Sequence, residues 1–257
     1  MIDVTMDGRG VATVVLDNAA KLNTLNSTVM AEFIEAFERL SREPALRCVV
    51  LRGAGERAFV GGADIREMAA LERESAARFI TLVHRCCEAP RRLSVPVIAR
   101  IQGYVLGAGL ELAAGCDMRV ASEDAMFGMP EVRIGLPSVV EAALLPGLIG
   151  WGRTRRLLLT GDMIGAAEAK EWGLVESAVP AVELDAEAER LAGSILTSGP
   201  RALALQKTLM QDWEELGVAA SVRRGIGCFE DTFATDEPRR MMAAFLERME
   251  KRRARKP

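Results

Sequence analysis

Two glutamates in apolar surroundings, Glu111 and Glu131, are the side chains best suited to chemistry in this sequence. Glu111 interrupts the apolar, helix-favouring segment 110–114, and Glu131 follows a proline between apolar neighbours twenty residues later. Burial raises the pKa of a carboxylate toward neutral pH, so such a pair could act as a general acid and base. Two structural glutamates in salt bridges explain the spacing alone at least as well.

Two glycine-rich turns could bind negative charge. QGYVLGAGLE covers residues 102–111 after the apolar run 96–101, and FVGGADI covers 59–65 after the run 48–52. Each turn is expected to open a helix, whose first N–H groups have no partner within the helix and attract anions. One such turn would most simply be a loop. Two of them, each at the end of a buried strand, indicate a ligand site, because ligands of α/β sheets gather at the carboxyl ends of strands. A dinucleotide is not expected, since Leu112 stands where that motif has its third Gly or Ala.

The elements that position these turns follow from hydrophobic periodicity. The strand-like runs Ile2–Met6 and Val11–Leu16 flank an Asp-Gly step, which predicts a hairpin. Ser27 is expected to cap an amphipathic helix, and the apolar run 48–52 predicts a buried strand after it. This order of strand, helix and strand predicts an α/β sheet with right-handed crossovers.

The C-terminal part of the chain has an almost purely helical pattern. The change from mixed α/β to helix alone near residue 200 predicts a terminal helical subdomain. Helices are predicted over 75–93, 139–149, 154–159, 166–172, 186–196, 201–216, 222–233 and 239–251.

Composition and charge limit the class of protein. The chain has 257 residues, 49% hydrophobic and 27% charged, which suits one large globular domain with a small helical annex. A net charge of −3 argues against general nucleic-acid binding, and no apolar stretch approaches the roughly 20 residues of a membrane span. The start of the sequence does not read as a signal peptide, so a cytoplasmic protein without a membrane partner is expected.

Cysteine and histidine usage argues against a metal centre. The five cysteines are odd in number and form no CxxC pair, which fits reduced thiols in a cytoplasm. His84 is the single histidine. We therefore expect no metal site, and we expect His84 on a helix surface or in packing rather than in catalysis.

Together, the turns and the acids resemble the crotonase superfamily, also called the enoyl-CoA hydratase/isomerase superfamily. The resemblance covers nearly the whole chain in the family's order. The matching segments are LNTLN at 22–26, CVVLRGAGERAFVGGADIREM at 48–68, VPVIARIQGYVLGAGLELAAGCDMRVAS at 95–122, FGMPEVRIGLP at 127–137, TGDMIGAAEAKEWGLVESAVP at 160–180 and the closing FEDTFATDEPRRMMAAFLERMEKR.

The resemblance implies an α/β fold, a crotonase-like spiral of ββα units over residues 1–199. A helical C-terminal subdomain, 200–257, would serve oligomerisation and cover the pocket. Family members are usually trimers or dimers of trimers, so one of these assemblies is expected. The implied substrate is an acyl-CoA thioester. Since coenzyme A arrives as part of the substrate, no separate cofactor is expected.

The family's site residues carry over to matching positions. The thioester carbonyl would lie between the backbone N–H groups of Ala63 and Ala108, which would stabilise an enolate. Glu111 would deprotonate a water for attack at the β carbon of a 2-enoyl-CoA, and Glu131 would exchange the proton at the α carbon. Contacts with substrate or CoA are expected from Lys21, Gly61, Asp64, Ile65, Arg66, Gly107, Pro137 and, from a neighbouring subunit, Lys251.

The segment after Pro137 departs from the family pattern. That pattern is glycine-rich with a Gln-Arg pair, whereas this chain reads SVVEAA over 138–143. The change is expected to reshape the acyl end of the pocket, and it adds Glu141 as an extra acid near the site. A first-turn helix charge stabilised by the helix dipole is the simpler interpretation of Glu141.

Two alternatives to a hydratase remain open. A Δ3,Δ2-isomerase, a decarboxylase or a thioester hydrolase could use the same enolate. Isomerases of the family typically keep only the second acid, so the presence of both favours the hydratase. A non-catalytic acyl-CoA-binding protein with a drifted pocket is the other alternative, and the retained acids argue against it.

Overall fold

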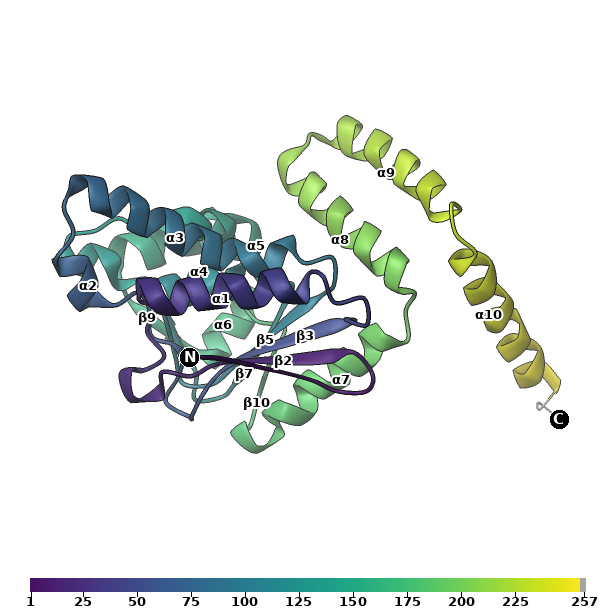
Figure 1. Cartoon of the computed structure of the whole chain (residues 1–257), viewed down its shortest axis with the longest axis horizontal. Helices are drawn as coiled ribbons and strands as arrows, with labels where there is room; N and C mark the ends of the chain where they lie inside the picture. The colour runs from purple at the N-terminus through teal and green to yellow at the C-terminus, as the bar shows by residue number, and fades with distance from the viewer. Residues whose placement is uncertain (255–257) are drawn as a thin grey trace. The chain divides into compact units, whose positions relative to one another are not determined.

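The computed structural model describes residues 1–254 of the chain. It divides into two compact units, Met1–Ile195 and the residues from Leu196 onward. The first unit holds both β-sheets and the second is made of helices (Figure 1). Both glycine-rich turns and both glutamates singled out in the sequence lie in the first unit.

A six-stranded sheet forms the centre of the first unit. Its strands lie in the order β1 (Ile2–Met6), β2 (Val11–Leu16), β3 (Cys48–Gly53), β5 (Val97–Ile101), β7 (Met118–Ser122) and β10 (Ser177–Val179). β1 and β2 form the predicted antiparallel hairpin, and all the other neighbours are parallel. Every residue of β5 is buried, as expected for a parallel strand covered on both faces.

A smaller sheet accompanies it. This sheet has the order β4 (Ala58–Val60), β6 (Tyr104–Leu106), β8 (Met126–Gly128) and β9 (Met163–Gly165), and only its last pair is antiparallel. Hydrophobic periodicity did not predict any of these four strands, because a strand of three residues is too short to show an alternation.

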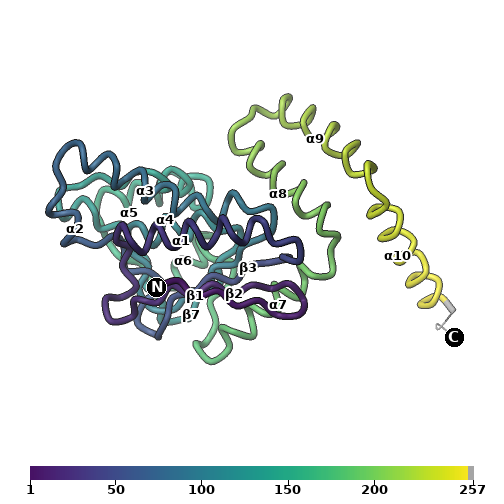
Figure 2. The backbone as a smooth tube through the Cα atoms, in the orientation of Figure 1, coloured from purple at the N-terminus to yellow at the C-terminus, as the bar shows by residue number. Residues whose placement is uncertain are grey.

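The same order of elements recurs along the chain and contributes strands to both sheets. β3 and β4 are followed by α2 (Ile65–Ala69) and α3 (Arg73–Arg92), and β5 and β6 are followed by α4 (Ala108–Ala114). Each repeat therefore places one strand in each sheet before its helix. This ββα order confirms the predicted spiral. Figure 2 traces the path of the backbone from the N-terminal strands to the C-terminal helices.

Helices cover the large sheet. α1 (Ser27–Leu40) packs beside α3 and buries a stripe of side chains that includes the stacked rings of Phe33 and Phe37 (Figure 1). The remaining helices of this unit are η1 (Ala19–Lys21), η2 (Pro130–Ile134), η3 (Val140–Leu144), α5 (Leu145–Thr160), α6 (Ala166–Trp172), η4 (Ala181–Glu183) and α7 (Leu184–Leu196).

Two local predictions were wrong. Asn26, not Ser27, caps α1: its side chain accepts a hydrogen bond from Val29 N at 2.8 Å, while Ser27 begins the helix and bonds Glu67. The helix predicted over 139–149 is instead the 3₁₀ helix η3 followed by α5, which has a kink at Gly150 (φ 77°, ψ 158°).

The second unit contains α8 (Pro200–Glu215), α9 (Val218–Thr232) and α10 (Glu237–Ala254). The Glu237 carboxylate accepts hydrogen bonds from the Arg201 and Ala202 N–H groups at the start of α8. Large apolar side chains of this unit are exposed, among them Trp213, Ile226, Phe229, Phe245 and Leu246. The predicted role of the helices in oligomerisation and pocket cover stays a prediction.

Among residues 1–254, no helix combines the length and the apolar character needed to cross a lipid bilayer.

Candidate active site

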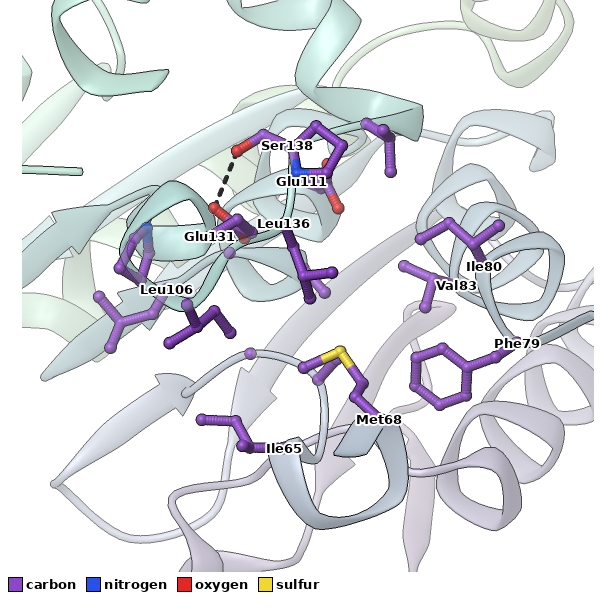
Figure 3. Close-up of a pocket in the computed structure, with 18 of the residues that line it drawn as sticks. Ile65, Met68, Phe79, Ile80, Val83, Leu106, Glu111, Glu131, Leu136 and Ser138 are labelled. Carbon is purple, nitrogen blue, oxygen red and sulfur yellow. Dashed lines mark hydrogen bonds between the residues drawn. The ribbon is translucent and has the colours of Figure 1, made fainter. Parts of the chain in front are cut away.

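A cavity of about 570 Å³ in the first unit gathers most of the predicted site residues. It is lined by Gly61, Gly62, Ala63, Ile65, Met68, Leu71, Ala76, Ala77, Phe79, Ile80, Val83, Leu106, Gly107, Ala108, Glu111, Pro130, Glu131, Ile134, Leu136, Pro137, Ser138 and Val139. Figure 3 shows the two glutamates and Ser138 on one side and Met68 and Phe79 on the other. An apolar wall thus faces two acids.

The turn after β4 presents the N–H of Ala63. Ala63 pairs with Leu25 in an isolated parallel bridge, in which Gly62 O accepts from Leu25 N and Asp64 N donates to Leu25 O, each at 2.8–2.9 Å. Since successive peptide groups of an extended chain point to opposite sides, the N–H of Ala63 points away from Leu25. Asp64 then caps α2, as predicted, by accepting from Arg66 N and Glu67 N.

The turn after β6 presents the N–H of Ala108. Gly107 has a φ of 51° and precedes α4, and its carbonyl accepts from the N–H groups of Leu110 and Glu111. Ala108 is the first residue of the helix, so its N–H has no acceptor one turn earlier. Within residues 1–254, neither the Ala63 N–H nor the Ala108 N–H donates a hydrogen bond to another residue.

Close packing holds the two turns together. β4 and β6 are parallel neighbours, so their carboxyl ends meet at one edge of the small sheet. A Cβ on Gly109 would collide with the Val60 carbonyl oxygen, and one on Gly62 would lie 3.1 Å from Leu106 O. Glycine at these two positions lets the backbones approach closely enough for both alanine amides to line the same cavity.

Asn23 holds the chain where β4 begins, ahead of the turn that carries Ala63. Its side chain is fully buried; the amide nitrogen donates to Ala54 O and Ala58 O at 3.0 and 2.8 Å, and the amide oxygen accepts from Asn18 N at 3.0 Å. The neighbouring Leu22 carbonyl accepts from Gly61 N at 2.8 Å. The LNTLN segment therefore fixes the loops at the ends of two strands. Its composition alone does not reveal these partners.

Glu111 is buried, with 4% of its surface exposed. Its Oε1 accepts a hydrogen bond from Ala142 N at 3.2 Å. Burial, reinforced by the charge of Glu131, raises the pKa of Glu111 to about 8, although the Ala142 amide acts in the opposite direction. Of the two acids, Glu111 therefore retains its proton to the higher pH.

Glu131 is half-buried at the start of η2. Its Oε2 accepts from the Ser138 hydroxyl at 2.8 Å (Figure 3), and its Oε1 occupies the space that a Cβ on Gly107 would need. Burial raises the pKa of Glu131, and the hydrogen bond from Ser138 partly offsets this rise. The two acids repel each other when both are charged, so they titrate as a coupled pair.

The other predicted contacts divide into two groups. Gly61, Ile65, Gly107 and Pro137 line the cavity. Outside the lining are Asp64, which caps α2; Lys21 and Arg66, which are exposed; and Lys251, which is exposed on α10 in the second unit.

The environment of Glu141 differs from the predicted one. It does stand in the first turn of η3, but its side chain is buried rather than held at the surface by a helix dipole. Its Oε1 lies 2.7 Å from Nδ1 of His84 on α3. His84 lies partly exposed on α3 and outside the cavity, in keeping with its predicted place on a helix surface, but its pairing with a buried acid was not predicted.

Sequence reasoning missed several residues of the cavity. Ser138, which bonds Glu131, was recognised only as a departure from the family pattern. Met68, Phe79 and Val83 form the apolar wall from α2 and α3. The apolar stripe of α3 was a usable signal for a buried face, but it could not say that part of this face lines a cavity.

No cysteine of the described residues lines the cavity. All five cysteines are buried, and burial raises the pKa of the Cys86 and Cys87 thiols, which keeps them protonated. In the described part of the chain, no three His, Cys, Asp or Glu side chains cluster so as to hold a metal ion.

The ββα spiral, with two amide-presenting turns and two acids around one cavity, defines a protein of the crotonase class. The family model described as Enoyl-CoA hydratase/isomerase matches residues 7–254, and the chain belongs to this family.

Individual relatives are similar to this chain over nearly its full length. The chain is 34% identical to the crotonyl-CoA hydratase of Syntrophomonas wolfei, with 92% of each chain covered. It is 33% identical to the short-chain-enoyl-CoA hydratase of Clostridium acetobutylicum, covering 93% of this chain and 92% of that one. The crystal structure of an enoyl-CoA hydratase from Bacillus anthracis superposes with a TM-score of 0.92 at 32% identity, covering 96% of each chain.

Proposed function

We propose that this protein is an enoyl-CoA hydratase that adds water across the 2,3-double bond of a 2-enoyl-CoA thioester. The observation that carries the proposal is that two unpaired backbone amides and two acids line a single cavity with an apolar wall. The names of the relatives from S. wolfei and C. acetobutylicum support a short-chain 2-enoyl-CoA as substrate.

The alanine amides supply the electrostatic part of the reaction. The thioester carbonyl accepts hydrogen bonds from the Ala63 and Ala108 N–H groups. When the oxygen of water bonds to the β carbon, the π electrons move toward the carbonyl and leave an enolate oxygen between these donors. A donor of this kind typically contributes about 10²–10³ in rate.

The acids move the protons. One carboxylate takes a proton from the attacking water, and the other carboxyl gives a proton to the α carbon as the enolate collapses. The pair gains one proton and loses one, so the product is the substrate plus one water. Proton transfer by positioned groups contributes roughly 10²–10⁴ in rate.

The active form is the pair that carries one proton. In the free site this proton lies on Glu111, whose pKa is about 8. If Glu111 is the base, as the resemblance implies, the proton must pass to Glu131 through the bound water before the attack. In either assignment the rate falls when the pair gains a second proton at low pH or loses its only proton near pH 8.

The remaining features of the proposal follow the family. We propose that no cofactor is needed beyond the coenzyme A of the substrate. We propose a homotrimer or a dimer of trimers in the cytoplasm, in which Lys251 of one subunit meets the coenzyme A bound to its neighbour. The charged side chains Lys21 and Arg66, both exposed, would contact the same group.

An acyl-CoA panel tests the proposal. The protein is incubated with a short 2-enoyl-CoA and with the matching 3-enoyl-CoA, and absorbance of the conjugated thioester and product mass are followed. The expected result is loss of conjugation from the 2-enoyl-CoA and a product heavier by one water. Turnover of the 3-enoyl-CoA alone would indicate an isomerase, and release of free CoA would indicate a hydrolase.

A further inference from the structure

The segment 138–142 touches both acids of the proposed site. The Ser138 hydroxyl donates to Glu131 Oε2 at 2.8 Å, and the Ala142 N–H donates to Glu111 Oε1 at 3.2 Å. One short stretch of chain therefore fixes the positions of two carboxylates that lie twenty residues apart in sequence.

The backbone between these two contacts is strained. Val140 has a φ of 39°, one of three positive φ values at residues other than glycine within residues 1–254. A β-branched residue rarely adopts this region, and strain of this kind persists only where surrounding contacts impose it. Something must therefore hold the segment against relaxation.

Glu141, next to the strained residue, ties the segment to α3. Its side chain is 8% exposed, and Oε1 lies 2.7 Å from Nδ1 of His84. Among the described residues, Glu141 Oε2 is buried and has no hydrogen-bond partner. The buried carboxylate thus depends on His84, because an ion left unpaired in the interior is strongly destabilising.

His84 connects this buried acid to the surface. The imidazole is 44% exposed, and its Nε2 lies 4.0 Å from Glu88 Oε2, one helical turn along α3. The titratable groups that face Glu141 are thus His84 and Glu88, Cys86 and Cys87 on α3, and Glu111 on α4.

We propose that His84 and Glu141 form a positioning pair that anchors segment 138–142 to α3 and so holds Glu111 and Glu131 in their reacting geometry. Neither residue lines the cavity, so both act through Ser138 and Ala142 rather than on the substrate. The proposal rests on the hydration proposed above and names two further residues on which that reaction depends.

A second effect of the pair is electrostatic. The charge of Glu141 helps to raise the pKa of Glu111. A Glu141→Gln variant keeps the shape of the side chain and an oxygen for His84, but it removes the charge. Its alkaline limit of activity should therefore move to lower pH, which a purely structural role would not cause.

The test compares four variants with wild type by kcat and KM on a short 2-enoyl-CoA across pH. His84→Ala should lower kcat by about 10–100-fold with KM changed by less than about threefold, because substrate contacts remain while the acids are misplaced. His84→Asn, whose amide nitrogen can stand near the place of Nδ1, should restore most of the loss. The matched control Glu88→Gln removes the charge of another neighbour of His84 but leaves the contact between His84 and Glu141 in place, and its kcat should stay within twofold of wild type.

The outcomes separate the two proposals. Suppose that the wild type hydrates the substrate and that His84→Ala and Glu141→Gln have the same kcat and the same alkaline limit as wild type. This result overturns the positioning pair and leaves the proposed function intact. A loss in His84→Ala that His84→Asn does not rescue also counts against the positioning pair. If His84→Ala does not fold, Glu141→Ala takes its place and should show the same fall in kcat with KM little changed, and an unchanged kcat in that variant overturns the pair. A wild type that does not hydrate any 2-enoyl-CoA overturns the proposed function, and the positioning role falls with it.

Discussion

The two halves of the proposed site are built in opposite ways. The amide half consists of the Ala63 and Ala108 N–H groups, set by glycines and helix starts within a few residues of each donor and by the backbone bridge between Ala63 and Leu25. The acid half consists of side chains held by segment 138–142, which is distant in sequence from Glu111 and is itself anchored to α3. The glycine-rich sequence around each donor marks its position, whereas no local pattern marks the contacts that hold the acids.

This difference predicts different sensitivities. The amide half has no side chain to remove, so it should respond to steric changes that move the backbone or fill the gap between the turns. The acid half should respond to changes in charge and in hydrogen bonding. The following variants test this contrast, beginning with the largest expected effect.

Removal of charge from Glu131 should have the largest effect on the acid half. Glu131→Gln is expected to lower kcat for hydration by about 10²–10⁴, because the pair can no longer both accept and donate a proton. Binding should persist, since the alanine amides are intact. Steady-state rates and calorimetric titration with the hydrated product measure the two quantities, and near-native turnover would remove Glu131 from the mechanism.

A methyl group on Gly107 should damage both halves at once. It would collide with Glu131 Oε1, and the φ of 51° is unfavourable for alanine. We expect Gly107→Ala to lower kcat by about 10²-fold through the displaced acid and to lose about 1–3 kcal/mol of stability.

Gly147→Ala is the matched control for that variant. Gly147 lies in α5, and a Cβ there meets nothing within 4 Å. This variant should keep its rate and gain about 0.5–1 kcal/mol, since alanine favours a helix over glycine. Equal rates in the two variants would contradict the close approach of Gly107 and Glu131.

The buried Glu111 should lower the free energy of unfolding as pH rises. Its pKa is near 8 in the folded protein and near 4.5 in the unfolded chain, so the folded state binds more protons between these values. Wild-type stability therefore falls from pH 4.5 to 8 relative to Glu111→Gln, by about 2–4 kcal/mol in total. Denaturant unfolding of both proteins at several pH values measures this difference, and a constant difference would place Glu111 in a solvated setting.

The smallest expected effect is that of Ser138. Its hydroxyl favours the ionised form of Glu131, so Ser138→Ala should raise the pKa of Glu131 and move the acid limb of kcat/KM to higher pH. Ser41→Ala, which removes a hydroxyl that donates to Glu38 O on α1, should leave the limb in place. If the acid limb of kcat/KM lies at the wild-type pH in both variants, Ser138 has no influence on the ionisation of Glu131.

The same contrast explains how much could be predicted from the sequence. Asp64 as a cap, the helix after Gly107 and the long strands of the large sheet follow from local patterns, and the structure confirms them. The family resemblance supplied the spiral and the site positions that local patterns could not connect.

Predictions failed where a partner distant in sequence decides the outcome. Ser27 was assigned the cap that its neighbour Asn26 provides, because both residue types are favoured caps and only the distant partner of Ser27, Glu67, distinguishes them. The bonds of Asn23 and the pairing of His84 with Glu141 depend on packing between elements far apart in sequence. None of these contacts leaves a periodic or compositional trace.

Isotopic labelling tests the central claim most directly. The protein is incubated with a short 2-enoyl-CoA in water labelled with both deuterium and oxygen-18, and the product is analysed by mass spectrometry and NMR. If the amides and acids hydrate the double bond as proposed, the product carries one heavy oxygen at C3 and one deuterium at C2, and the thioester stays intact. Heavy oxygen in a free carboxylate, or deuterium without heavy oxygen at C3, would contradict the account.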